Sequence, residues 1–196
     1  MFHLVRLVLY AFPLPGSVQA PDPSVGVELI RVKKGDPAVE QVVKVLKPDL
    51  VHQRLERGEI FFGAVHEGKI VSYCWLAQGK IGIEEINLAV CTQPGEVYLY
   101  DAYTLAPWRG KGLYPVVLRE MLQYAGQNGF SRALIFVAAD NTASRRGVLK
   151  AGFLEFQVVT CLAIFGFSFH RYSEALHGQR PPVFKPLREL ELERSL

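Results

Sequence analysis

The sequence has few cysteines, and none of them belongs to a recognisable metal-binding or disulfide pattern. The three cysteines are Cys74, Cys91 and Cys161. They lie far apart in the sequence, no two of them form a CxxC motif, and each lies in an apolar run. A zinc site or a disulfide framework is therefore not expected. We expect no metal, and a reducing, cytoplasmic compartment.

Long apolar runs are absent too. No segment reaches the roughly 18–20 apolar residues that a membrane-spanning helix needs, so no membrane span is expected. Residues 1–12 are apolar enough to suggest a signal peptide, but Pro13 and Pro15 interrupt them and Pro21 would follow the cleavage point. These prolines favour an N-terminal arm over a secretion signal.

The excess of charge of one sign is small. The chain has 22 basic and 19 acidic side chains, a formal net charge of +3, which does not by itself predict a nucleic-acid partner, and none is expected. Hydrophobic residues at 49% and charged residues at 21% exclude a disordered or fibrous chain. The 196 residues fit one domain of about 150 residues with some 40 residues of appendage.

Three segments are expected along the chain. Residues 1–26 form an arm with a Pro-rich linker, residues 27–172 the domain, and residues 173–196 a tail. Leu187, Leu190 and Leu192 among alternating charges predict a short peripheral helix in the tail. The arm can add a strand, cap a hydrophobic patch or join a homodimer, and the sequence leaves these alternatives open.

Apolar periodicity predicts the order of elements within the domain. Strands are expected over 27–32, 60–65, 70–77, 83–90, 97–105 and 132–138, and helices over 37–47, 49–57, 113–127 and 141–151. The four strands from 60 to 105 are joined by turns too short for helical crossovers, which favours an antiparallel meander. Residues 153–169 predict one long strand or a hairpin broken at Gly166.

A glycine-rich loop joins the strand ending at Leu105 to the helix that follows, with the order Arg109-Gly110-Lys111-Gly112-Leu113-Tyr114. Glycines let backbone N–H groups approach a ligand closely, and the helix directs the positive end of its dipole at the same place. These are the properties of a phosphate-binding loop. Two other phosphate-binding motifs are excluded. The loop lacks the third glycine of the dinucleotide-binding fingerprint, and it lacks the Lys-Ser or Lys-Thr that follows the second glycine of a P-loop.

Basic residues gather around this loop. Between Ala106 and Lys150 there are seven basic and two acidic side chains, an excess larger than that of the whole chain. We interpret Arg109 and Lys111 as ligands of an anion, and Arg119 and Arg132 as residues of solvated faces.

The string LAPWRGKGLY, followed about 30 residues later by DNTASRRGVLKAGF, resembles the GNAT superfamily of acyl-CoA-dependent acyltransferases. The family's two patterns fall on Arg109, Gly112 and position 114, and on Asn141, Ser144, Gly152 and Phe153. The resemblance covers roughly residues 27–172. It implies an α+β fold in three layers, with a mixed, mostly antiparallel central sheet of six to seven strands and helices on both faces.

The resemblance also implies the roles of several residues. Backbone N–H groups of residues 110–114 would bind the pyrophosphate of acetyl-CoA or another acyl-CoA. Backbone groups near residues 103–105 would hold the thioester carbonyl, and pantetheine would lie in a gap between the strands ending at Leu105 and Ala138. The cofactor-binding set is Thr104, Leu105, Arg109, Gly110, Lys111, Gly112, Leu113, Tyr114, Asn141 and Ser144.

Two residues depart from the family pattern. Tyr114 stands where the family usually has Gly or Ala, so either the helix start approaches the cofactor differently or the ring turns away from it. Val148 stands where many members carry the Tyr that protonates the leaving thiolate. That general acid is absent from its usual place.

The general base is not fixed by the motifs. Glu96, at the start of a central strand, is the first choice, and it would act through water. Asp101 is the second, because a charge in the middle of a strand rich in Tyr and Leu needs a partner or a purpose. Tyr103 lies nearest the expected carbonyl site and is a candidate for protonating the thiolate.

The expected activity is transfer of an acetyl or other acyl group from acyl-CoA to a primary amine of a small molecule or peptide, by direct attack in a ternary complex. Two alternatives remain. A non-catalytic acyl-CoA-binding module is favoured by Val148 and by the unassigned base. An aminoacyl-tRNA-dependent transferase would need a more extended basic surface than this sequence provides.

Overall fold

A computed structural model describes residues 2–16 and 23–188. Its main sheet has eight strands in the order β10-β9-β1-β8-β7-β4-β3-β2, and only the pair β7–β8 is parallel. The strands are β1 (Phe2–Pro13), β2 (Glu28–Val32), β3 (Ile60–His66), β4 (Lys69–Ala77), β7 (Glu96–Thr104), β8 (Arg132–Ala138), β9 (Leu154–Ile164) and β10 (Phe167–Tyr172). The mixed, mostly antiparallel α+β fold is confirmed, but with eight strands instead of six or seven.

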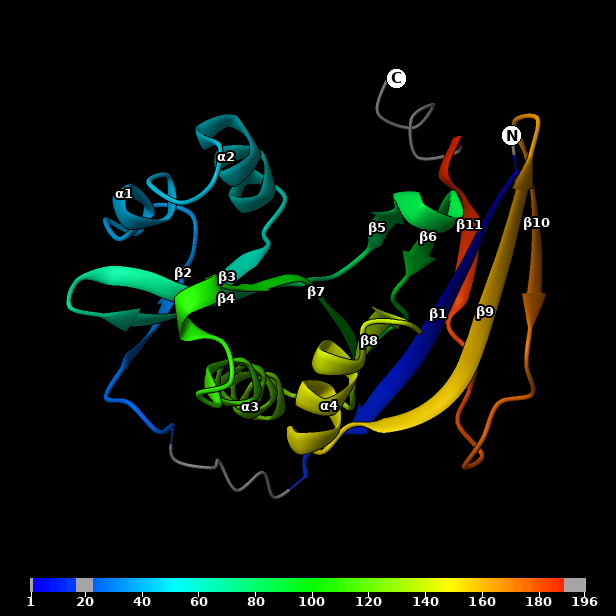
Figure 1. Cartoon of the computed structure of the whole chain (residues 1–196). Coiled ribbons are helices and arrows are strands. Elements are labelled where there is room, and N and C mark those ends of the chain that lie inside the picture. Colours follow the sequence, from blue (N-terminus) through cyan, green and yellow to red (C-terminus); the bar gives the residue numbers. More distant parts are fainter. Residues whose placement is uncertain (1, 17–22, 189–196) are drawn as a thin grey trace.

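Helices cover both faces of this sheet, as expected (Figure 1). The short helices α1 (Val39–Val42) and α2 (Pro48–Glu56) pack on one face, and α3 (Leu113–Gln127) and α4 (Thr142–Lys150) on the other. The helix expected over 37–47 is shortened to the single turn α1, flanked by turns. Among the described residues, no helix is both long and apolar enough to cross a bilayer.

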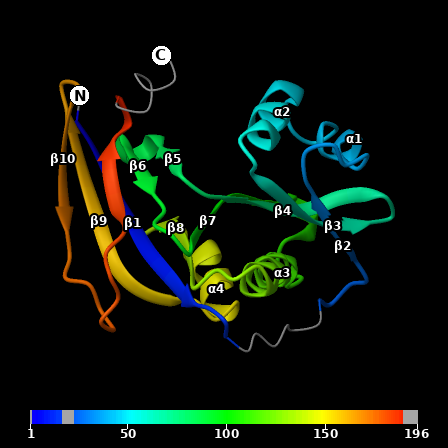
Figure 2. The ribbon, with the colours of Figure 1, turned by 180° about the vertical axis from the view of Figure 1, so that it is seen from behind.

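The N-terminal arm is an integral part of the sheet. Strand β1 pairs antiparallel with both β8 and β9 (Figure 2). From Leu7 to Phe12 every side chain of β1 is buried, because alternate residues face the two hydrophobic clusters on either side of the sheet. The boundary expected after residue 26 therefore does not separate an appendage from the core.

The expected four-strand meander is wrong at residues 83–90. That segment is divided into β5 (Lys80–Ile83), a 3₁₀ turn (Glu84–Ile86) and β6 (Leu88–Cys91), with Asn87 in a left-handed conformation. The β5–β6 hairpin leaves the main sheet and joins β11 (Val183–Pro186) in a second, three-stranded sheet. Strand β4 consequently pairs directly with β7.

The C-terminal part of the chain contributes two further findings. Residues 154–172 form the hairpin β9–β10, which turns at Phe165 and Gly166, so the second of the two expected alternatives is confirmed. Most of the peripheral helix expected around Leu187, Leu190 and Leu192 lies outside the described residues.

Candidate cofactor and acyl-transfer site

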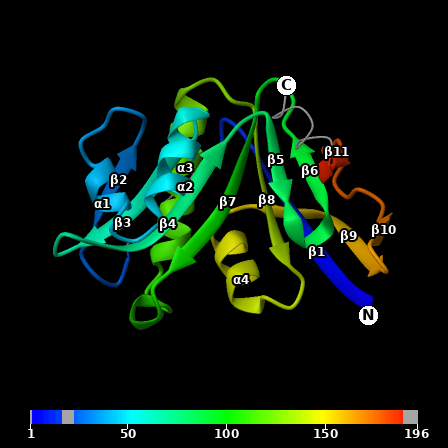
Figure 3. The same ribbon diagram turned by 90° about the horizontal axis from the view of Figure 1, so that it is seen from above.

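Two neighbouring parallel strands diverge at the centre of the sheet. Strands β7 and β8 pair only from Glu96 to Leu99 on one side and from Arg132 to Ile135 on the other. Beyond that point residues 100–104 of β7 have no pairing with β8, and Figure 3 shows the two strands separating with α4 in the opening. The gap expected between the ends of β7 and β8 is therefore present.

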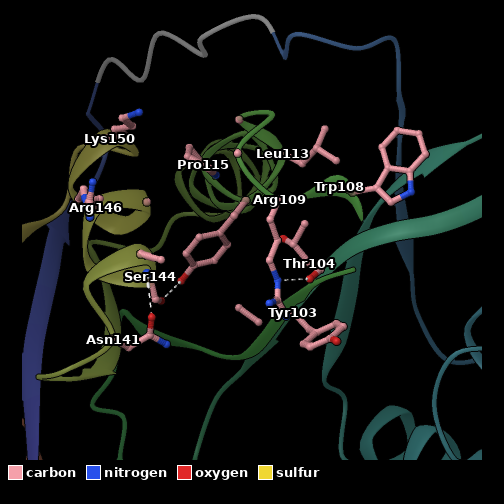
Figure 4. A pocket seen from close by; sticks show the side chains of 16 residues that line it. Tyr103, Thr104, Trp108, Arg109, Leu113, Pro115, Asn141, Ser144, Arg146 and Lys150 are labelled. Atoms are coloured by element: carbon pink, nitrogen blue, oxygen red, sulfur yellow. Dashed lines mark hydrogen bonds between the residues drawn. The ribbon is translucent and has the colours of Figure 1, made fainter. Parts of the chain in front are cut away.

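A cavity of about 680 Å³ lies where these elements meet. Its walls come from the end of β7, the glycine loop, the start of α3 and the α4 helix (Figure 4). The lining includes eight of the expected cofactor residues: Thr104, Arg109, Gly110, Gly112, Leu113, Tyr114, Asn141 and Ser144. Residues more than 30 positions apart in the sequence thus meet around one space.

The glycine loop exposes backbone donors at this cavity. Gly110 and Gly112 have φ values of 77° and 78°, a conformation that favours glycine, and a Cβ at either would meet no atom within 4 Å. Gly112 is the N-cap of α3 and provides no side-chain cap, so the first N–H groups of the helix have no intrahelical partner. These N–H groups and the helix dipole suit an anionic group such as a pyrophosphate.

Only part of the expected basic set reaches the cavity. The Nε of Arg109 donates to the Thr104 carbonyl at 3.0 Å, and its guanidinium lies 5.6 Å from the Tyr103 ring centroid. The Nζ of Lys111 lies 4.4 Å from the Trp108 ring centroid, and Lys111 does not line the cavity. Lys111 therefore adds positive charge near the cavity but is not part of its wall.

Two basic residues were missed as ligands in the sequence. Arg146 and Lys150 line the cavity from α4. Their i, i+4 spacing places them on one face of the helix, and this signal could have identified them. Arg145 is turned elsewhere, because it donates to Tyr10 and pairs with Glu155 at 3.1 Å.

The Asn-x-x-Ser pattern forms the start of α4. The Asn141 side chain caps the helix, with its Oδ1 accepting from the Ser144 N–H at 3.0 Å. The Ser144 hydroxyl donates to the Tyr114 hydroxyl at 3.5 Å. This pattern therefore fixes α4 and connects it to α3.

Tyr114 of α3 contacts α4 through both its ring and its hydroxyl. Its ring packs against Gly147, where a Cβ would lie only 2.5 Å from the ring atom Cδ1. Burial raises the pKa of the Tyr114 phenol, so the side chain is neutral at physiological pH. The bulk that replaces the small residue of the family pattern is accommodated by a glycine on the facing helix.

Strand β7 carries a β-bulge beside the gap. Its pairing with β4 shifts by one residue between Tyr100 and Tyr103, and Asp101 within the bulge has a φ of 49°. Ala102, Tyr103 and Thr104 follow and line the cavity. Such bulges re-aim side chains and interrupt the ladder, as this one does next to the candidate site.

Leu105 differs from its expected role. Its N–H donates to the Val71 carbonyl at 3.0 Å, and it does not line the cavity. Because this N–H is already used in pairing with β4, Leu105 is not a free donor for a thioester carbonyl. Tyr103 and Thr104 remain at the site.

The structure does not bring Glu96 to the site. Glu96 is only 2% exposed and pairs with Arg132 at 3.2 Å and with Arg180 at 3.1 Å. It lies at the opposite end of β7 from Thr104, about 26 Å away at roughly 3.3 Å per residue. The first choice of general base is therefore wrong, and Arg132, whose side chain is 11% exposed, is its ion-pair partner and not a residue of a solvated face.

Asp101 does not line the cavity, although Ala102, which follows it in β7, does. Its Oδ2 accepts from Nη1 of Arg54 on α2 at 2.5 Å, and its side chain remains partly exposed. The Arg54 guanidinium in turn lies 5.0 Å from the Trp75 ring centroid and 4.9 Å from that of Tyr100. The carboxylate is thus held on the sheet face that carries α1 and α2.

Comparisons with known proteins agree with this geometry. Residues 35–153 match the model of the acetyltransferase (GNAT) family. No curated protein matches the chain. A putative GNAT acetyltransferase from Novosphingobium aromaticivorans is 16% identical with a TM-score of 0.56, and the match covers 81% of this chain and 63% of that one.

Two other solved structures are similar in fold. A GNAT-family acetyltransferase from Colwellia psychrerythraea has 17% identity, a TM-score of 0.54 and coverage of 88% of this chain and 55% of its own. A GCN5-related N-acetyltransferase from Sphaerobacter thermophilus has 19% identity, a TM-score of 0.57 and coverage of 82% and 51%. The matched part of this chain corresponds to between 51% and 63% of the length of these three proteins. With the family match over more than half of its residues, the chain belongs to the GNAT acetyltransferase family.

Proposed function

We propose that this protein transfers an acetyl group from acetyl-CoA to a primary amine of a small molecule or peptide in a ternary complex. The observation that carries the proposal is the cavity at the divergence of β7 and β8, which the α3 N-terminus and three basic side chains line. These donors fit a polyanionic ligand. When bound, acetyl-CoA would supply the activated thioester.

The chain's own residues would bind and orient acetyl-CoA. The N–H groups at the start of α3, with Arg109, Arg146 and Lys150, would hold the phosphates. The unpaired edge of β7 at residues 100–104 would orient the pantetheine by backbone hydrogen bonds. The three buried cysteines, between which no disulfide is found, support the proposed reducing, cytoplasmic compartment.

Asp101 is the proposed general base. Its carboxylate is partly exposed at the bulge, and Arg54 holds it in place. It would accept a proton from the attacking ammonium, and the acceptor would then approach from the sheet face that carries α1 and α2. Tyr103, exposed at the cavity, would return a proton to the leaving sulfur.

A steady-state assay of coenzyme A release across a panel of amines tests the activity. Asp101→Asn should lower kcat by about 100-fold or more with little change in acetyl-CoA affinity, because general-base catalysis contributes about 10²–10⁴-fold. Lys34→Met, at an exposed ion pair outside the cavity lining, is the control. Equal rates for Asp101→Asn and the control would remove Asp101 from the mechanism.

A non-catalytic acyl-CoA-binding module is the second candidate. Val148, at the usual position of the general acid, is fully buried and has no ionisable group. Calorimetric binding of acetyl-CoA without acceleration by any amine would favour this function over the transferase.

A further inference from the structure

An uncovered apolar surface lies on the sheet far from the cavity. On the face that carries α3 and α4, the register of β1, β9 and β10 aligns two apolar rows, which are Phe2–Ile164–Phe167 and Leu4–Leu162–Phe169. Phe165, at the turn between β9 and β10, adjoins them. We call these seven residues the β1–β9–β10 patch.

The β1–β9–β10 patch is not covered by any other part of the chain that the structure describes. The hairpin and the first half of β1 extend beyond α4, with the N-terminus beside the hairpin (Figures 1 and 2). Phe2 is 75% exposed, Phe165 83%, Phe167 70% and Phe169 61%. Among the described residues, therefore, no helix or loop shields these rings.

The exposed area is large for a monomer. At about 200 Å² for each phenylalanine, the four rings alone leave roughly 580 Å² accessible. The largest apolar patch of a typical monomer is about 300–600 Å², whereas one partner of a standard interface contributes about 800 Å². With Leu4, Leu162 and Ile164 added, the patch approaches the share of one partner.

The strand at the border of the patch is open as well. Strand β10 is the last strand of the main sheet, so one of its sides has no strand partner among the described residues. An exposed, apolar edge strand invites association unless another surface covers it. A third row of the same face, Arg6–Thr160–Arg171, is basic and borders the apolar rows.

We propose that a second copy of this chain covers the β1–β9–β10 patch, each copy burying its own patch against the other about a two-fold axis. A two-fold interface needs a self-complementary surface, and a flat apolar one meets that condition. Packed sheets lie about 10 Å apart, so the two apolar rows of each copy would interdigitate. The basic row would stay at the solvated rim, where its like charges are screened.

Sedimentation equilibrium and light scattering on the full chain between 1 and 100 μM test the proposal. The wild type is expected at twice the mass of the 22.0 kDa chain. Phe167→Ser with Phe169→Ser should raise the dissociation constant at least 100-fold, since each ring enters the interface twice. Leu176→Ser, which changes an exposed leucine outside the patch, is the control and should leave the dimer intact.

Folding and partner class are checked separately. Because Phe167 and Phe169 are mostly exposed in the single chain, the double variant should keep the wild-type far-UV circular dichroism spectrum and acetyl-CoA affinity, and should lose only the rise of thermal midpoint with protein concentration that dimerisation gives. Leu4→Lys gives a second disruption through charge. A monomeric wild type at 100 μM, or a double variant as dimeric as the wild type, would overturn the proposal. A monomer that sediments with phosphatidylserine vesicles would also overturn it and assign the patch to a membrane surface.

Discussion

The contact between Tyr114 and Gly147 gives a sharp test of how α3 and α4 shape the cavity. Gly147→Ala places a Cβ 2.5 Å from Cδ1 and 2.9 Å from Cε1 of the Tyr114 ring. Carbon atoms in good contact are about 3.5–4.0 Å apart, so the ring must retreat by about 1 Å. The two helices, joined by the Ser144–Tyr114 hydrogen bond, leave it little room.

Two opposing effects set the size of the change in stability. Overpacking a close-packed site costs about 1–3 kcal/mol, whereas replacing a helical glycine by alanine gains about 1 kcal/mol. We expect Gly147→Ala to lower the free energy of unfolding by about 0–2 kcal/mol. Gly126→Ala on α3 is the matched control, because its Cβ would meet no atom closer than 3.8 Å, and it should raise that free energy by up to about 1 kcal/mol.

Urea unfolding at 25 °C measures both variants, and a double-mutant cycle isolates the contact. In a Tyr114→Ala background the ring is gone, and Gly147→Ala should become stabilising like the control. The expected coupling is about 1–3 kcal/mol. Calorimetry should also show weaker acetyl-CoA binding for Gly147→Ala, because the displaced ring lines the cavity. Equal effects of Gly147→Ala in both backgrounds would refute the reasoning.

Three further predictions concern the loop, the buried ion pairs and alkaline pH. Gly112→Asp should raise the acetyl-CoA dissociation constant at least 100-fold in calorimetry by placing a carboxylate at the α3 N-terminus, whereas Gly129→Asp, at the same φ in open space, should not. Glu96→Gln should cost about 3 kcal/mol in urea unfolding by leaving the mostly covered Arg132 guanidinium without its charge partner, with kcat unchanged. Burial raises the pKa of Tyr73 to about 12 from its ordinary value of 10.0, so the unfolded chain loses this proton first. Stability should therefore fall as pH rises from 10 to about 12, and Tyr73→Phe should make that fall shallower in urea unfolding; an unchanged pH dependence in Tyr73→Phe would contradict this.

Local chemistry was readable from the sequence because it depends on neighbouring residues. The glycine loop, and the alternative of a hairpin broken at Gly166, each follow from backbone preferences of a few adjacent positions. Strand order is not local. Nothing near Leu7 specifies that β1 enters between β8 and β9, although its apolar run is typical of a strand buried on both faces.

Glu96 is misassigned for the same reason: the contacts that decide its role are distant in the sequence. Its identity as a carboxylate at a strand start gave no information on its partners, which lie 36 and 84 residues away in the sequence. The sequence does indicate Asp101, because a charge within an aromatic strand needs a partner or a purpose. The structure supplies Arg54 and a bulge, features that require the pairing of β4 with β7 and the docking of α2.

The departure at Tyr114 is a compensated exchange and not a loss of the binding loop. The Tyr114 ring of α3 packs where Gly147 of α4 has no side chain, so the ring fits between the two helices. A neutral phenol there neither repels phosphate nor removes the N–H groups at the helix start. It narrows the α4 side of the cavity instead, which leaves the open edge of β7 as the surface along which an extended ligand can lie.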